Sequence, residues 1–205
     1  MPPRPPNPSE HPLSRSSSAC YTAEMALAPA LLLSMPQLLD PNFVRTVVLL
    51  CEHAPEGAFG LVVNRPSDVR AADAVSLEPA IDAPNELPLF IGGPVEPQRG
   101  WILTAEPPKN IEHRELGSGL FLSASPVLLR RALMTQPKPE RTIVLAGYAG
   151  WGPGQLDQEI EMSSWLIMPV ELDLIFDVAP GLSWDAAIRR LGADPNLLQM
   201  GQGVH

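Results

Sequence analysis

Short apolar runs separated by turn residues constrain the fold of this chain more than any other feature. The clearest run, TVVLLCE at residues 46–52, is rich in β-branched and aliphatic side chains, which favour strands. The turn Glu56-Gly57-Ala58 follows it, and residues 59–63 (FGLVV) form a second apolar run. The two runs therefore predict a β-hairpin. Further strands are expected at residues 31–33, 87–91, 101–104, 120–122, 142–146 and 172–176.

Helix signals fall between these runs. Ser125 followed by Pro126 is typical of a helix start, and the apolar residues after it are spaced as on one helix face. We also expect helices over residues 67–75, over 155–165, and from Ser183 to Gly192. Residues 101–104 are expected to pair with 87–91, so hairpins occur alongside strand-to-helix steps. The pattern predicts an α+β protein with a mixed, largely antiparallel sheet and flanking helices.

The chain of 205 residues suits one domain with an N-terminal extension. Residues 1–24 are rich in proline and serine and have no apolar periodicity, so we expect a disordered tail that the fold does not need. Met25 offers an alternative start of translation. Residues 25–205 are expected to form the single domain.

Charge and cysteine content narrow the classes of partner and compartment. The formal net charge of −9 opposes attraction to phosphate backbones and to anionic membranes, so we expect no direct binding to nucleic acid and no membrane contact. Folding could still gather Arg130, Arg131 and Arg141 into a local basic patch. The two cysteines, Cys20 and Cys51, do not form a disulfide framework, and a cytoplasmic protein fits them best.

The sequence contains none of the common nucleotide, metal or nucleophile motifs. It has no Walker loop, no C-x-x-C, no H-E-x-x-H and no G-x-S-x-G. Its four histidines make a multi-histidine metal site hard to build. We therefore expect no metal site and no cofactor.

The first segment with possible chemistry is Cys51-Glu52-His53, at the end of the strongest strand. Residues i and i+2 of a regular strand point to the same face, so Cys51 and His53 could form a thiol–imidazole pair or half of a metal site. The alternative is a buried Cys51 that fills the core, with His53 at the start of the turn.

The second segment, Gly147 to Gln155 (GYAGWGPGQ), is expected to turn the chain from a strand into a helix. Free backbone N–H groups at such a turn can bind an anion, but the helix that follows carries Asp157, Glu159 and Glu161, which would repel one. A structural turn, a binding surface and an acid–base pair all stay open. We also expect Gly150 or Gly152 to need a positive φ or close backbone packing.

Several blocks, in order, resemble one known family. The blocks are Leu33-Ser34-Met35-Pro36 with Asp40-Pro41-Asn42-Phe43, Cys51-Glu52-His53, GLVVNRP at residues 60–66, IGGPV at 91–95, and residues 147–155 with Glu159 and Trp165. Together they resemble the YqgE/AlgH family over residues 30–192. The resemblance implies a bifurcated, largely antiparallel sheet curled into a pseudo-barrel. It also implies a protein of a kind often described as a transcriptional regulator, without an established activity.

This chain departs from the family pattern at two places. The family shows an aromatic residue and then a histidine where this chain has Trp101 and Thr104, so no role for that histidine carries over. The N-terminal tail is also foreign to the family.

The first functional hypothesis is a non-enzymatic regulatory or binding protein that acts through a protein partner or a small ligand. Arg65 offers a planar fork for a carboxylate or phosphate, or forms a salt bridge with Glu159. The alternative is an enzyme that uses Cys51, His53 and nearby carboxylates. The expected binding groove is lined by Asn64, Arg65, Gly92, Gly93 and the Gly147–Gln155 segment, which supplies Gly150, Trp151, Gly152 and Gln155 next to Glu159.

Overall fold

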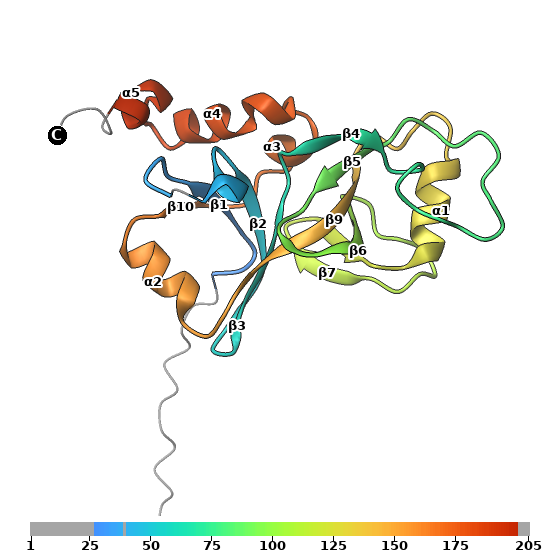
Figure 1. Cartoon of the computed structure of the whole chain (residues 1–205), viewed down its shortest axis with the longest axis horizontal. Helices are drawn as coiled ribbons and strands as arrows, with labels where there is room; N and C mark the ends of the chain where they lie inside the picture. The colour runs from blue at the N-terminus through green and yellow to red at the C-terminus, as the bar shows by residue number, and fades with distance from the viewer. Residues whose placement is uncertain (1–26, 39, 201–205) are drawn as a thin grey trace, which may run out of the picture.

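Strand β9 (Thr142–Trp151) joins the two halves of one branched sheet in the computed structural model, which describes residues 27–38 and 40–200 (Figure 1). The first part of β9 lies between β5 (Pro88–Ile91), which runs parallel to it, and β6 (Val95–Thr104), which runs antiparallel. Its last residues pair instead with β3 (Gly57–Val62). The sheet therefore divides along β9.

The pairing around β9 is largely antiparallel. One half continues from β3 through β2 (Val47–Ala54) and β1 (Ala30–Ser34) to β10 (Trp165–Met168). The other half continues from β6 through β8 (Leu120–Ser123) to β7 (Arg114–Gly117), while β4 (Pro66–Arg70) pairs with β5. These elements make a single α+β domain, as the sequence predicted. The sheet does not close on itself, so the pseudo-barrel describes it only loosely.

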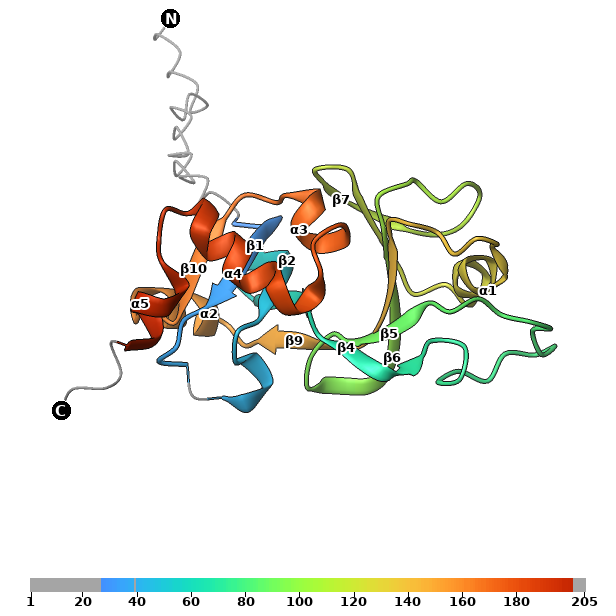
Figure 2. The same ribbon diagram turned by 90° about the horizontal axis from the view of Figure 1, so that it is seen from above.

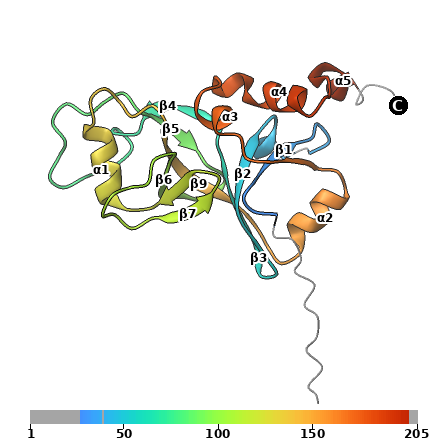
Figure 3. The same ribbon diagram turned by 180° about the vertical axis from the view of Figure 1, so that it is seen from behind.

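Helices cover different parts of the sheet. Figure 2 shows α1 at the opposite end of the molecule from the layer formed by α4 and α5, and Figure 3 shows α2 beside the β1–β3 half. Apolar side chains hold three of these helices on the sheet. Leu129 of α1 belongs to the same buried cluster as Val144, Leu156 of α2 to that of Val48, and Trp184 of α4 to that of Leu31. The bounds are α1 Pro126–Met134, α2 Gln155–Glu161, α3 Leu172–Phe176, α4 Pro180–Arg190 and α5 Pro195–Met200, with a 3-10 turn at Pro41–Phe43.

The elements set by local sequence signals are confirmed. Strands β2 and β3 form the predicted hairpin, in which Val48 pairs with Val62 and Ala54 with Gly57. Helix α1 starts at Pro126, and its buried face consists of the predicted apolar residues. Both features depend on residues close together in the chain.

Two secondary-structure predictions are wrong. Residues 67–75 are not a helix, because residues 66–70 extend as β4 to pair with β5 and a turn follows. Residues 172–176 are not a strand but the helix α3, which packs against α4. A run as short as LDLIF suits either state, and here Arg190 of α4 binds Asp173 and lowers the pKa of its carboxyl. In both segments, contacts with residues remote in the chain determine the secondary structure: β4 pairs with β5, and α3 packs against α4.

Other boundaries move. The helix predicted to reach residue 165 ends at Glu161, and Trp165 opens strand β10. The last predicted helix begins at Pro180, so Ser183 lies inside it and does not cap it. Residues 147–151 belong to β9, which confines the turn to residues 152–154. Strands β5 and β6 do not pair with each other, because β9 lies between them.

The predicted tail, residues 1–24, lies outside the described residues. Within the part of the chain that the structure describes, no helix combines the length and the hydropathy that a membrane span requires.

Candidate functional site

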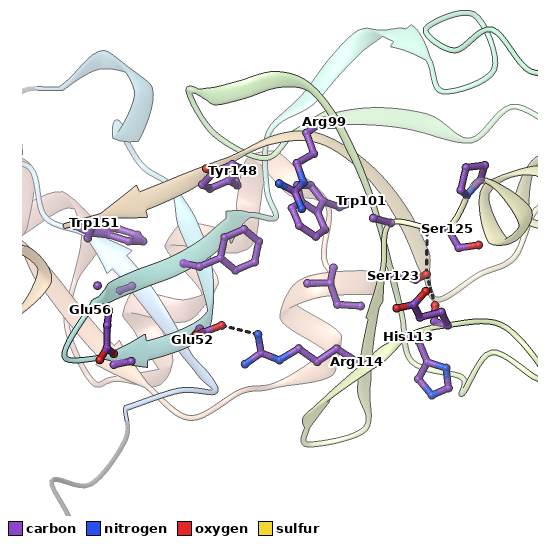
Figure 4. A pocket seen from close by; sticks show the side chains of 18 residues that line it. Glu52, Glu56, Arg99, Trp101, His113, Arg114, Ser123, Ser125, Tyr148 and Trp151 are labelled. Atoms are coloured by element: carbon purple, nitrogen blue, oxygen red, sulfur yellow. Dashed lines mark hydrogen bonds and ion pairs between the residues drawn. The ribbon is translucent and has the colours of Figure 1, made fainter. Parts of the chain in front are cut away.

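An open cleft of about 820 Å³ lies between the β2–β3 hairpin and strands β6, β7 and β8 (Figure 4). Its volume falls within the range of roughly 300–1,000 Å³ that is usual for small-molecule sites. Aromatic, charged and hydroxyl side chains share its walls. The lining residues with such side chains are Glu52, Glu56, Phe59, Arg99, Trp101, Glu112, His113, Arg114, Ser123, Ser125, Tyr148 and Trp151.

Three aromatic rings in mutual contact form one wall of the cleft. The centroid of Phe59 lies 5.1 Å from that of Trp101 and 5.1 Å from that of Tyr148, and the Trp101 and Tyr148 rings meet edge to face at 6.4 Å. They come from β3, β6 and β9, and the pairing of β9 with both neighbours brings them together. All three rings are partly exposed. The Trp101 Nε1–H is buried and has no hydrogen-bond partner among the described residues.

An irregular segment of β6 places a cation on this wall. The register against β9 shifts between Val95 and Gly100, and Glu96 takes a positive φ of 45°. The guanidinium of Arg99 lies 4.6 Å from the centre of the Trp101 ring and forms an ion pair of 3.2 Å with Glu96. Figure 4 shows Arg99 lying against Trp101. The segment therefore presents a cation that is already held by an aromatic face and a carboxylate.

A second arginine ties the two sides of the cleft together. Arg114 of β7 donates a 2.6 Å hydrogen bond to Glu52 of β2 (Figure 4). Glu52 faces the cleft because a β-bulge lies between Leu50 and Glu52, after which Glu52 pairs with Phe59. Both side chains are about half exposed, so the pair acts as a polar edge of the cleft and contributes little to stability.

The same bulge separates Cys51 from His53. Cross-strand partners share a face, and His53 pairs with Ala58, which packs in the cluster on the α2 side of the sheet. Cys51 packs in the other cluster, with Leu31. The expected thiol–imidazole neighbours therefore lie on opposite faces, and His53 Nε2 lies 3.0 Å from Oδ1 of Asp157 on α2.

Cys51 behaves as a core side chain. It is 4% exposed, and its Sγ contacts the carbonyl oxygen of Leu49 at 3.5 Å. Burial raises the pKa of the thiol to about 12, far above the value at which a thiolate nucleophile would form near neutral pH. The described residues also contain no group of three or more side chains that could hold a metal ion.

We expect Cys51 to react with a thiol reagent at pH 8 at least about a hundredfold more slowly in the native protein than in denaturant. Burial keeps the reagent away from the sulfur, and the raised pKa keeps the thiol protonated. The pKa of this thiol is higher in the folded protein than the unfolded value of 9.0. Its contribution to the free energy of unfolding is therefore fully present below pH 9.0 and is lost as the pH rises toward 12. Absorbance kinetics with an aromatic disulfide reagent would measure the rates, in a Cys20→Ser background. Fast labelling of the native protein would support the alternative hypothesis, in which Cys51 is a catalytic nucleophile.

Asn64 and Arg65 bind the backbone beside the 3-10 turn. The Asn64 side chain accepts from the Val47 N–H at 2.8 Å and donates to the Arg45 carbonyl at 3.0 Å. Arg65 donates to the carbonyl oxygens of Asn42, Pro41 and Val44. Its guanidinium therefore stabilises this turn, and the expected salt bridge with Glu159 is not formed.

Gly92 and Gly93 pack against the backbone of β9. A Cβ at Gly92 would lie 2.4 Å from the Gly147 carbonyl oxygen, and one at Gly93 would lie 2.2 Å from the Tyr148 carbonyl carbon. The two glycines thus allow the backbone of β9 to pack directly against residues 92–93, which leaves no groove between them and residues 147–149.

The remaining predicted residues cluster at the far end of β9. Trp151 lines the cleft and donates from Nε1 to Glu159 at 2.9 Å. Gln155 bridges the Gly152 N–H and Glu159, with hydrogen bonds of 3.1 and 2.9 Å. Gly150 is exposed and pairs with Phe59. Neither Gly150 nor Gly152 has a positive φ or a backbone clash at a Cβ, so that prediction is wrong. The left-handed residues of the segment are Gly147, with φ 72°, and Gly154, with φ 67°.

Most residues of the cleft were not among those predicted from the sequence. Phe59, Trp101 and Tyr148 lie in three segments remote from one another in the chain, and neither Arg99 nor Arg114 belongs to a recognisable motif. No signal in the sequence indicated that these three aromatic residues meet, and Tyr148 lay in the segment that was expected to form a turn.

Comparison with known proteins identifies the relatives of the chain. The sequence profile of the AlgH-like family matches residues 31–196. A UPF0301 protein of Myxococcus xanthus is 43% identical over 181 residues, which is 87% of this chain and 98% of that protein. A UPF0301 protein of Anaeromyxobacter dehalogenans is 40% identical over 190 residues, covering 88% and 96%.

Two solved structures share the fold. The solution structure of AlgH from Pseudomonas aeruginosa matches with a TM-score of 0.67 at 36% identity, over 90% of this chain and 98% of AlgH. The crystal structure of DIP2367 from Corynebacterium diphtheriae matches with a TM-score of 0.59 at 26% identity, over 84% and 90%. By its sequence profile, its relatives and its fold, the chain belongs to the AlgH-like family.

Proposed function

We propose that this protein is a non-enzymatic binding protein whose cleft holds a small organic ligand. The observation that carries the proposal is the wall of three contacting rings, Phe59, Trp101 and Tyr148, on an open cleft of about 820 Å³. Partly exposed rings offer large apolar faces to a ligand at low entropic cost, and such pockets are common ligand sites.

The construction of the cleft supports binding without large rearrangement. Each ring stands on a strand whose neighbours are hydrogen-bonded, so the wall is formed before a ligand arrives. Arg114 and Glu52 add a polar edge that could orient the ligand. The proposal excludes thiol catalysis, since Cys51 is buried and His53 lies on the other face of the sheet.

Any effect on transcription is proposed to be indirect, through the ligand or a protein partner, in the cytoplasm. The net charge of −9 opposes DNA binding. Many guanidinium groups are also neutralised by carboxylates, including Arg141 by Asp177 and Arg70 by Asp73 and Glu86. Arg141, one of the three arginines that folding could have gathered into a basic patch, is thus already paired.

The test is a fragment screen by ¹H–¹⁵N NMR. We expect hits to shift amide signals of β3, β6 and β8, and to lose about tenfold in affinity in the Tyr148→Leu variant, which removes one ring face. Phe176→Leu is the matched control, because Phe176 is a partly exposed aromatic residue of α3 that does not line the cleft. Hits that bind Tyr148→Leu and Phe176→Leu equally well would contradict the proposal, as would a screen without hits.

A further inference from the structure

The cleft lining carries two arginines, which both form ion pairs, and three glutamates, of which only Glu52 is paired. Arg99 forms its ion pair with Glu96, and Arg114 forms its ion pair with Glu52. Both guanidinium groups are therefore already neutralised by the protein, and an incoming anion would have to compete with an existing carboxylate for either of them.

Two lining carboxylates have no such partner. Glu56 lies in the turn of the β2–β3 hairpin, and Glu112 lies just before β7. Neither side chain forms an ion pair or a hydrogen bond with the residues that the structure describes. In Figure 4, Glu56 lies at the Trp151 end of the cleft, and His113, the neighbour of Glu112 in sequence, lies at the other end. The charge left for a ligand is therefore negative at both ends.

The aromatic wall between these carboxylates also favours positive charge. The faces of tryptophan, tyrosine and phenylalanine attract cations within about 6 Å of the ring centre. Arg99 already uses one face of Trp101 in this way, at 4.6 Å. The contacting rings of Phe59 and Tyr148 remain partly exposed beside it.

From these contacts we infer that the ligand of this cleft is an organic cation, an amine or quaternary ammonium on an apolar or aromatic body. The inference rests on the proposed function, since it assigns a ligand class to the same cleft. The body of the ligand packs on Phe59 and Tyr148, and the cationic group lies near Glu56 or Glu112. The acidic net charge of the chain adds a favourable field for cations and opposes anions.

The experiment compares three probes that share one ring and differ in charge: benzylammonium, benzyl alcohol and benzoate. NMR titration of the full chain at low salt would give the three dissociation constants. We expect benzylammonium to bind about tenfold more tightly than benzyl alcohol, and benzoate to bind more weakly than either. Added salt should reduce the preference for benzylammonium, because these carboxylates are exposed.

Variants then assign the preference to the two carboxylates. Glu56→Gln combined with Glu112→Gln should bring benzylammonium to within about twofold of benzyl alcohol and leave benzyl alcohol unchanged. Glu161→Gln is the control, because it removes an equal charge from the exposed surface of α2, away from the cleft lining.

The outcomes distinguish the two levels of the proposal. Equal binding of benzylammonium and benzyl alcohol, or tighter binding of benzoate, would overturn the organic cation and leave a small-ligand cleft standing. A charge preference that survives in the double variant would also overturn the assignment. Binding of none of the three probes would count against the cleft as a small-ligand site and against the cation with it.

Discussion

Replacing Gly93 with alanine is expected to destabilise the protein by about 3 kcal/mol or more, a loss of about 8 °C in Tm for a chain of this length. Two costs add at this residue. Its φ of 152° lies in a region that L side chains rarely adopt. A Cβ there would also lie 2.2 Å from the Tyr148 carbonyl carbon and 2.4 Å from the Ala149 nitrogen, and backbone atoms cannot rotate away.

Matched glycines separate the two costs. Gly154 has a positive φ of 67° but nothing within 4 Å of a Cβ, so Gly154→Ala should cost about 1 kcal/mol, for conformation alone. Gly100 has neither feature, and Gly100→Ala should stay within about 0.5 kcal/mol of the parent. Chemical denaturation with equal m-values would measure all three. A Gly93→Ala variant as stable as Gly100→Ala would show that the approach of β9 to this turn is not required.

The order of the strands explains how much of the fold could be read from sequence. The β2–β3 hairpin and the start of α1 depend on neighbours in the chain, and both were predicted correctly. The insertion of β9 between β5 and β6 depends on contacts remote in sequence, and the segments at 87–91 and 101–104 were wrongly expected to pair directly. The branched sheet itself was available only from the family resemblance.

One extra residue explains why the predicted Cys51–His53 pair fails. A regular strand would place the two side chains on one face, but the bulge after Leu50 shifts the alternation by one position. Nothing in the residues TVVLLCEH marks the bulge. It turns Glu52 toward the cleft and His53 toward α2, so the feature that removes one candidate site helps to build another.

The aromatic wall could not be predicted for a related reason. Phe59, Trp101 and Tyr148 meet only because β9 pairs with β3 at one end and with β6 along its length. Each ring alone resembles an ordinary core or surface aromatic. The predicted Gly147–Gln155 lining segment contains Tyr148 and Trp151, whereas Phe59 and Trp101 were not predicted to line a site.

Removing Glu159 is expected to have the second large effect, about 3 kcal/mol for Glu159→Ala. Its Oε2 accepts from the indole N–H groups of both Trp151 and Trp165, at 2.9 and 2.8 Å. Both tryptophans are less than 10% exposed, so alanine would leave two buried donors without an acceptor, each at a cost of about 1–3 kcal/mol. Its Oε1 accepts from Gln155, which would lose that bond as well.

Two further variants test this reading of Glu159. Glu159→Gln keeps one acceptor oxygen for the indoles but turns an amide N–H₂ toward Gln155, so we expect about half the loss. Glu161→Ala removes an exposed carboxylate from the same helix and should cost less than about 0.5 kcal/mol. Denaturation curves followed by tryptophan fluorescence would rank the variants, and equal stability of Glu159→Ala and Glu161→Ala would contradict this role of Glu159.

Because Trp151 also lines the cleft, Glu159→Ala should weaken ligand binding even at temperatures where the variant is folded. Glu159 would then act as a positioning residue, which fixes one wall of the cleft from the opposite side of the sheet.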